Sequence, residues 1–167
     1  MIRAAKCIVI AAVGAVFLPL AAHGGIADSP LPVLSAGKTT LHLYSVPGVI
    51  GGAGGLGTYF ACTSTDTAAM QVGVELFGPA GGAPGNDAAA TSLAVAPGAT
   101  VILGTSAAAG ISIDSSLGGL FSKGSARILA TSKKLACTAF IADAGNAPPT
   151  SMVYLTIIKK TKQKAAN

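Results

Sequence analysis

Apolar and polar residues alternate along most of this chain. In MQVGVELF, residues 70–77, every second residue is apolar, which is the period of a strand with one buried face. Runs rich in β-branched and aromatic residues, which favour strands, recur at short intervals. They are TTLHLYSV (39–46), TYFACTST (58–65), TSLAVAPGATVILG (91–104), SARILATS (125–132), LACTAFIAD (135–143) and MVYLTIIKK (152–160). No window beyond the first 22 residues combines a helical stripe with capping residues, so the pattern predicts strands.

Seven or eight short strands separated by Gly/Pro turns predict an all-β chain, built as a single antiparallel β-sandwich. We expect Pro97-Gly98 to form a turn that joins two short strands, and Lys133-Lys134 to form an exposed hairpin turn. Two longer segments, 78–91 and 106–124, lack a regular strand pattern and are expected to be loops. If this protein binds a ligand through loops, residues 81–86 and 106–119 are the candidates.

A glycine-rich run, GAGGLG at residues 52–57, has the G-x-G-x-x-G spacing of dinucleotide-binding loops, and Glu75 follows near the place of a ribose-binding acid. That function needs a helix directly after the third glycine, because the helix N-terminus binds the pyrophosphate. Here TYFACTSTDTAAM follows, which predicts a strand. Glu75 lies on the polar face of its own strand, where we expect it to be solvated. The run therefore predicts a connection between strands rather than a nucleotide site.

Residues 1–22 have the layout of a secretory signal peptide, with a basic start followed by an uncharged apolar run. The run is shorter than the roughly 20 residues of a membrane-spanning helix. We expect a signal helix cleaved after Ala22, with Ala27 as the second choice and an uncleaved anchor as the alternative. The β-sandwich domain would then be residues 28–158, with no membrane span left after cleavage. The protein is expected to be secreted or periplasmic.

The net charge of the chain does not change the expected class of protein. The chain carries +5, but loss of Arg3 and Lys6 with the signal leaves nine basic against six acidic residues. Four of the nine are lysines in the tail 159–167, which we expect to be disordered. The body between signal and tail therefore lacks the basic surface that nucleic acids require, and no nucleic-acid partner is expected. Hydrophobic residues make up 51% but aromatic residues only 5%, which indicates a core of small side chains.

Cysteines give one structural expectation. After signal removal two remain, Cys62 and Cys137, each in the middle of a predicted strand. In an exported protein an even pair indicates a disulfide, and two cysteines allow one connectivity. Two buried free thiols are the alternative. A bridge between strand centres would stabilise the fold rather than carry redox chemistry, which favours C-x-x-C.

Candidate chemistry is sparse. Apart from His23 at the cleavage region, the only histidine is His42, which we expect to be a half-exposed strand residue. No G-x-S-x-G frame is present, and no two of the dispersed acidic residues have the spacing of a paired acid and base. Asp87 and Asp143 each lie near an asparagine and offer oxygen ligands for calcium, but no calcium loop surrounds them. The sequence thus assigns no catalytic, cofactor-binding or metal-binding residue. Tyr59, Phe60, Phe77 and Phe140 are expected in the core.

Three segments carry a family resemblance: LGTYFACTSTDTAAMQVGVELFGPAGG (56–82), SLAVAPGATVILGT (92–105) and GSARILATSKKLACTAFIADAGNAPPTSMVYLTI (124–157). In these the chain resembles a group of small exported bacterial proteins of uncharacterised function. LAVAPGATVIL also resembles the proline-glycine turn before a strand in bacterial immunoglobulin-like sandwiches. The resemblance implies an exported, disulfide-bonded, immunoglobulin-like β-sandwich, and it supplies no catalytic or ligand-binding residues.

These observations favour a non-enzymatic protein with a structural or interaction role at the cell surface or in the periplasm. Its low charge leaves strand edges poorly protected, which favours self-assembly, and residues 28–46 would then complete a neighbour's sheet. The alternative is a monomeric module that binds an extracellular ligand or glycan through the loops 81–86 and 106–119. A secreted hydrolase that uses His42 comes third.

Overall fold

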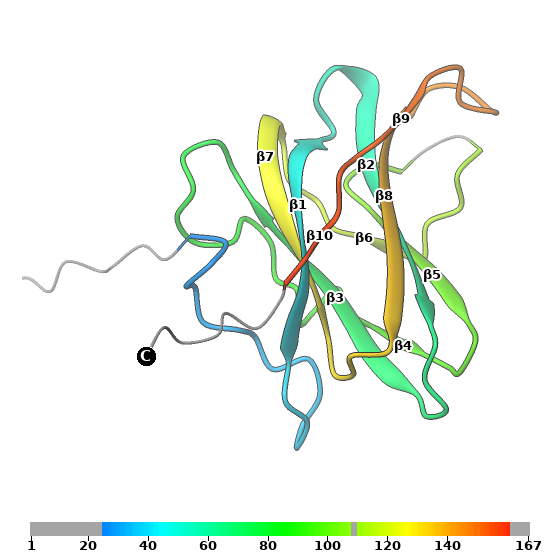
Figure 1. Ribbon diagram of the computed structural model, residues 1–167. Helices are drawn as coiled ribbons and strands as arrows, with labels where there is room; N and C mark the ends of the chain where they lie inside the picture. The colour runs from blue at the N-terminus through cyan, green and yellow to red at the C-terminus, as the bar shows by residue number, and fades with distance from the viewer. Residues whose placement is uncertain (1–24, 108–109, 161–167) are drawn as a thin grey trace, which may run out of the picture.

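The computed structural model describes residues 25–107 and 110–160, and these form an all-β fold of two packed sheets (Figure 1). The strands are β1 Leu41–Gly51, β2 Leu56–Ser64, β3 Met70–Phe77, β4 Leu93–Val95, β5 Thr100–Gly104, β6 Ser115–Ser116, β7 Phe121–Ala130, β8 Leu135–Asp143, β9 Met152–Tyr154 and β10 Ile158–Lys159. The all-β prediction is confirmed. Ten strands are present rather than seven or eight, because several short pairings lie within segments expected to be loops or single strands.

Each sheet contains five strands. The first sheet, called sheet A, has the order β10-β1-β7-β3-β4, and sheet B has the order β6-β5-β2-β8-β9. All pairings are antiparallel except β5 with β6, which run parallel. The two sheets face each other as the layers of a sandwich, and consecutive strands often belong to different layers (Figure 1).

Period-2 alternation sets the faces of the inner strands. On β3 the apolar residues Val72, Val74 and Leu76 point into the space between the sheets, and on β2 Phe60 and Cys62 meet them there. This main core contains mostly small branched side chains, as the composition indicated. Tyr59 and Phe140 are buried as expected, but in a separate cluster on the outer face of sheet B. Phe77 is buried as well.

The expected turn at Pro97-Gly98 and the expected hairpin at Lys133-Lys134 are both connections between the layers. Pro97-Gly98 joins β4 in sheet A to β5 in sheet B, and Lys133-Lys134 joins β7 in sheet A to β8 in sheet B. The turn chemistry itself was correctly assigned, since Gly98 has φ +74° and both lysines are exposed. A tight reversal looks the same in sequence whether the next strand pairs with the last or packs over it. The hairpin interpretation was therefore wrong in topology.

The glycine-rich run at residues 52–57 also connects the two sheets. A single 3-10 turn, Ala53–Gly55, lies between β1 and β2, with Gly54 and Gly55 at positive φ. A strand and not a helix follows the third glycine of the motif, so no helix N-terminus is available for a pyrophosphate. The expectation of a connection between strands is confirmed.

The run at 152–160, expected to be one strand, forms two in different sheets. β9 is the edge of sheet B and β10 the edge of sheet A, and Leu155 and Ile157 between them pack against the core. Lys159 belongs to β10, and the Lys160 N–H donates to the Leu43 carbonyl. Ordered structure thus continues through Lys160, whereas the tail was expected to begin at Lys159.

Cys62 and Cys137 lie directly opposite each other on β2 and β8 and form a disulfide, with their Cα atoms 4.1 Å apart. The bridge closes a separation of 75 residues and is compatible with an oxidising compartment outside the cytoplasm. The expected signal peptide, residues 1–22, and residues 161–167 of the tail lie outside the described residues. Within residues 25–107 and 110–160, no helix is long and apolar enough to cross a membrane.

Candidate functional site

A buried ion pair lies on the outer face of sheet A. Glu75 on β3 and Arg127 on β7 are direct cross-strand partners, and Arg127 Nε donates to Glu75 Oε2. Their exposed fractions are 4% and 1%. The prediction that Glu75 is solvated was therefore wrong. Its strand face was assigned correctly, but an N-terminal segment packs over that face and excludes water.

Arg127 holds this N-terminal segment in place. Its terminal nitrogens donate to three backbone carbonyls, those of Ile26, Ser29 and Pro30, at 3.0–3.3 Å. The guanidinium also lies 5.3 Å from the centre of the Phe77 ring, within the range of a cation–π contact. One side chain thus joins two strands and the N-terminal segment, which makes it the centre of this face.

The same segment is folded locally around Arg127. The Ser29 N–H donates to the Gly25 carbonyl, and the Gly25 N–H donates to Asp28 Oδ1 at 2.6 Å, so residues 25–29 form a compact turn. Farther along, Leu34 packs with Leu129 of β7, and its N–H donates to Thr40 Oγ1 at 3.2 Å. In the described chain, the segment expected to complete a neighbour's sheet is anchored on its own sheet, and residues 41–51 form β1.

A bulge in β1 brings two polar side chains together beside this pair. The register of β1 against β7 shifts between His42 and Tyr44, which places His42 and Ser45 on the same outer face. His42 Nε2 lies 3.0 Å from Ser45 Oγ, and His42 Nδ1 lies 3.3 Å from Lys160 Nζ. Lys160, His42, Ser45, Arg127 and Glu75 therefore form a row across sheet A, which we call the polar row.

Electrostatics keep His42 neutral. Partial burial, followed by the positive charges of Lys160 and Arg127, lowers the pKa of His42 to about 4. Lysine ammonium groups only donate hydrogen bonds, so the Nδ1 next to Lys160 must accept and the proton must lie on Nε2. Nε2–H then donates to Ser45 Oγ, which is the reverse of the arrangement that activates a serine nucleophile. A carboxylate that accepted a hydrogen bond from Nδ1–H would favour the other tautomer. Glu75 does not take this role, because its carboxylate is bound by Arg127.

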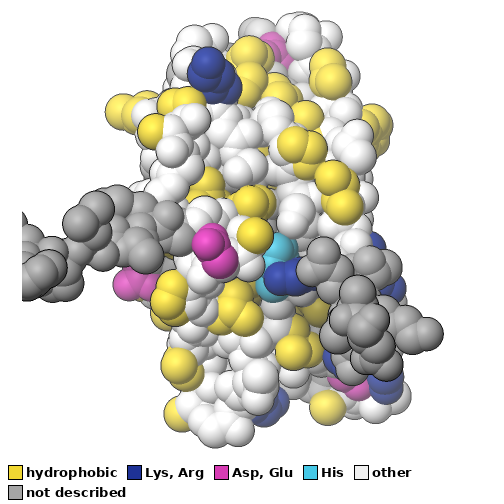
Figure 2. Space-filling model, turned by 60° about the vertical axis from the view of Figure 1, so that its left-hand side comes forward, with side chains coloured by type: hydrophobic (Ala, Val, Ile, Leu, Met, Phe, Trp, Pro, Cys, Tyr) yellow, Lys and Arg dark blue, Asp and Glu magenta, His cyan; other side chains and the backbone are white. Residues whose placement is uncertain are grey.

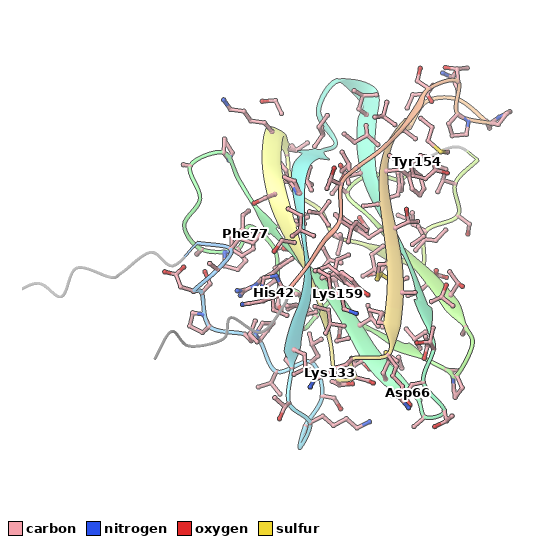
Figure 3. All side chains as sticks on the ribbon, viewed as in Figure 1. His42, Asp66, Phe77, Lys133, Tyr154 and Lys159 are labelled. Atoms are coloured by element: carbon pink, nitrogen blue, oxygen red, sulfur yellow. A yellow bond between two sulfur atoms is a disulfide. The ribbon has the colours of Figure 1, made fainter. Side chains whose placement is uncertain are left out.

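An open groove runs over one end of the polar row. It has a volume of about 890 Å³ and is floored by residues 40–45. One wall comes from the N-terminal segment at Ile26, Ala27 and Leu31, and the other from residues 158–160 of the C-terminal segment. Figure 2 shows the histidine at the surface in this hollow, directly beside a basic side chain and bordered by hydrophobic ones. Figure 3 labels His42 and Lys159 on the neighbouring strands β1 and β10, and they point to opposite sides. Lys159 is paired with Tyr44, whose side chain packs against the core, so the Lys159 side chain does not share the face of His42.

The loops proposed for ligand binding are used mainly for internal bonds, and they lie against different sheets. In residues 78–92, the Asn86 amide group accepts from the Leu76 N–H and donates to the Val74 carbonyl, which fastens this loop to the side of β3. In residues 106–114, Ile111 and Ile113 cover Tyr59 on the outer face of sheet B. The two segments touch where Ser115 Oγ donates to the Thr91 carbonyl at 2.9 Å, which lies outside residues 81–86 of the first candidate loop.

Both acids weighed as calcium ligands are used by their own loops. Asp87 accepts from the N–H groups of Ala89 and Ala90. Asp143 accepts from Asn146 Nδ2, Thr150 Oγ1 and the Ser151 N–H, and these bonds, Asn146 first, lower its pKa to about 2. Within residues 25–107 and 110–160, no group of three or more His, Cys, Asp or Glu side chains is placed to hold a metal ion.

The free edge of sheet B is a second notable surface. Asp143 N–H donates to the Ser151 carbonyl and Leu155 N–H to the Ala139 carbonyl, which fixes the pairing of β9 with β8. In an antiparallel ladder alternate residues face the partner. The backbone groups of Met152 and Tyr154 therefore face away from β8. Their side chains are exposed too, at 49% and 71%, with Val153 at 62% between them.

Tyr154 ends an aromatic row on the outer face of sheet B. Its ring meets Phe140 edge-on, with centroids 6.2 Å apart, and Phe140 stacks on Tyr59 at 5.4 Å. Figure 3 shows Tyr154 at the end of the C-terminal segment opposite to Lys159. The row therefore continues from a buried ring to an exposed one at the sheet edge.

Comparison with protein families, curated proteins and solved structures found no match to this chain.

The sequence pattern did not reveal the partners of His42 and Glu75. Ser45 and Lys160 flank His42 only because of the bulge and of β10, which alternation alone does not reveal. For Arg127 one signal existed: it is a lone charge within the apolar run SARILATS.

Proposed function

We propose that this chain is an exported, non-enzymatic protein with a structural or interaction role at the cell surface or in the periplasm, and that it associates with itself through β9. The observation that carries the proposal is the free edge of sheet B. There, outward backbone groups and exposed apolar side chains coincide at Met152 and Tyr154. An unprotected edge of this kind pairs readily with another strand.

The partner that fits best is the β9 of a second copy. Two identical strands related by a twofold axis pair antiparallel, each offering the other the same backbone groups. Segment 28–46 is less suited to this role than the sequence suggested, because its own sheet uses it. The edges on the other side of the sandwich are also less suited, since β6 contains only two residues and β4, which has three like β9, exposes no large apolar side chain.

Three finer points belong to this proposal. The signal-like residues 1–22 and the disulfide support export, to the periplasm or beyond the cell. An immunoglobulin-like connectivity is supported by the inner pairs β2–β5 and β3–β7 in opposite layers, with β4 and β5 joined across them. A non-enzymatic role is supported by the tautomer that Lys160 imposes on His42. The monomeric ligand-binding module stays the alternative, and a hydrolase that uses His42 comes third.

Sedimentation velocity of the purified exported protein over a series of concentrations tests self-association. We expect the sedimentation coefficient to rise with concentration in the wild type. A double variant, Met152→Lys and Tyr154→Lys, places charges on the edge and should remain monomeric. A wild type that is monomeric at every concentration would show the proposal to be wrong.

A matched control distinguishes association through β9 from nonspecific association of exposed apolar side chains. Leu120 is the most exposed large apolar residue, at 89%, and lies outside β9. Leu120→Lys removes an exposed apolar side chain and adds one charge of the same sign, so it should associate like the wild type. If it abolishes association as fully as the edge variant does, β9 is not the contact surface.

A further inference from the structure

The groove beside His42 combines apolar walls with charge of a single sign. The charged residues that line it are Lys133, Lys159 and Lys160, and no acidic residue lines it. Of these, Lys160 has its ammonium group next to His42. Its volume of about 890 Å³ is in the range of small-molecule sites, roughly 300–1,000 Å³. An anionic ligand with an apolar body satisfies both features at once.

Two acids lie near the groove, and only one of them, Glu75, is neutralised by an ion pair. Glu75, the acid of the polar row, is bound by Arg127 and buried, so it does not oppose an anion in the groove. Asp28 is exposed on the N-terminal side of the groove, next to Ala27. It would repel an anionic group there and direct that group towards the lysines of the opposite wall.

From this arrangement we infer that the groove binds a free fatty acid, with its carboxylate at Lys160 and its alkyl chain along Ile26 and Leu31. Ser45 and His42 lie on the floor between these ends. Because His42 is neutral and accepts from Lys160 at Nδ1, Lys160 is the charged group at this point and keeps two ammonium protons for a carboxylate. Carboxylate–ammonium contacts are charge-assisted and fix the orientation of the ligand.

This inference does not rest on self-association. The groove is formed by β1, β10 and the N-terminal segment, whereas the proposed contact surface is β9 at the edge of the other sheet. It gives the alternative function, a ligand-binding module, a different site from the loops considered in the sequence. Binding to the groove and association through β9 can each fail while the other holds.

Isothermal titration of the purified exported protein with laurate tests it, with monolaurin as a neutral ligand of the same chain length. We expect one laurate per chain and at least tenfold weaker binding of monolaurin, because a charge-assisted bond contributes about 1.5–3 kcal/mol. Equal affinity for both ligands, or no laurate binding, would overturn the inference.

Two variants locate the site. Lys160→Ala should weaken laurate binding by about tenfold or more while leaving monolaurin binding unchanged. The matched control, Lys123→Ala, removes one exposed lysine that does not line the groove. Both lysines are exposed, so both variants should fold, which thermal unfolding verifies. An equal loss in the control would show that laurate responds to net charge and not to this groove.

Discussion

Two cross-strand pairs hold the two sheets in different ways. In sheet A, Glu75 and Arg127 pair across β3 and β7, on the face turned away from the core. In sheet B, Cys62 and Cys137 pair across β2 and β8 and contact the core. The ionic pair needs a cover to exclude water, and the N-terminal segment provides it. The covalent pair needs no cover, so only the ionic pair couples its sheet to a third part of the chain.

The largest effect should come from breaking the ionic pair at one end. Arg127→Met leaves Glu75 buried without a counter-charge, and we expect the free energy of unfolding to fall by about 3–5 kcal/mol. Urea denaturation measures this loss. The carbonyls of Ile26, Ser29 and Pro30 also lose their donor, so limited proteolysis should cut the N-terminal segment faster.

A double variant separates the two roles of Arg127. Adding Glu75→Leu removes the uncompensated charge, so most of the lost stability should return. The N-terminal segment should still be cleaved quickly, because its carbonyls remain without a donor. If Arg127→Met alone costs less than about 1 kcal/mol, the pair does not have the structural role described here.

Loss of the disulfide should have the next largest effect. Replacing Cys62 and Cys137 with alanine frees a loop of 75 residues, and we expect a loss of about 2–4 kcal/mol in the free energy of unfolding. A reducing agent should destabilise the wild type by a similar amount and leave the double variant unchanged. Unlike the arginine variant, the reduced protein should keep its N-terminal segment resistant to protease.

A pair of tyrosines gives the smallest and sharpest contrast between the sheets. Tyr44 of sheet A donates its hydroxyl proton to the Leu135 carbonyl, so Tyr44→Phe should lower the free energy of unfolding by about 1 kcal/mol. The Tyr59 hydroxyl of sheet B is buried and has no hydrogen-bond partner among the described residues. Tyr59→Phe should therefore be neutral or slightly stabilising. Urea denaturation compares the two variants, and a larger loss for Tyr59→Phe would contradict the contrast.

The alternation of apolar and polar residues predicted the strands well, but it did not show which strand faces are covered by other segments of the chain. The pattern of β3 correctly separated Val72, Val74 and Leu76 from Glu75, because side chains alternate between the two faces of any strand. It could not show that Glu75 is buried, since the covering residues 26–34 lie some 40 positions earlier in the chain. Similarly, Lys133-Lys134 was recognised as a turn, but its sequence does not say in which sheet β8 will pair.

The candidate site was even less accessible from sequence. His42 was singled out for its residue type, yet its partners Ser45 and Lys160 depend on a bulge in β1 and on β10, a strand of two residues. The groove exists only because the two ends of the described chain meet β1 from opposite sides. No local pattern encodes such a meeting.

By itself, then, the sequence determined the all-β class, the inner faces of the main strands and the pairing of Cys62 with Cys137. Each depends on residue type or on a period of two, which are local properties. Only the tertiary structure decided which sheet each strand joins, which polar face is covered and where the groove lies. Those outcomes come from contacts between distant segments, such as Arg127 with residues 26–30, and their free energy arises only after the sheets have packed.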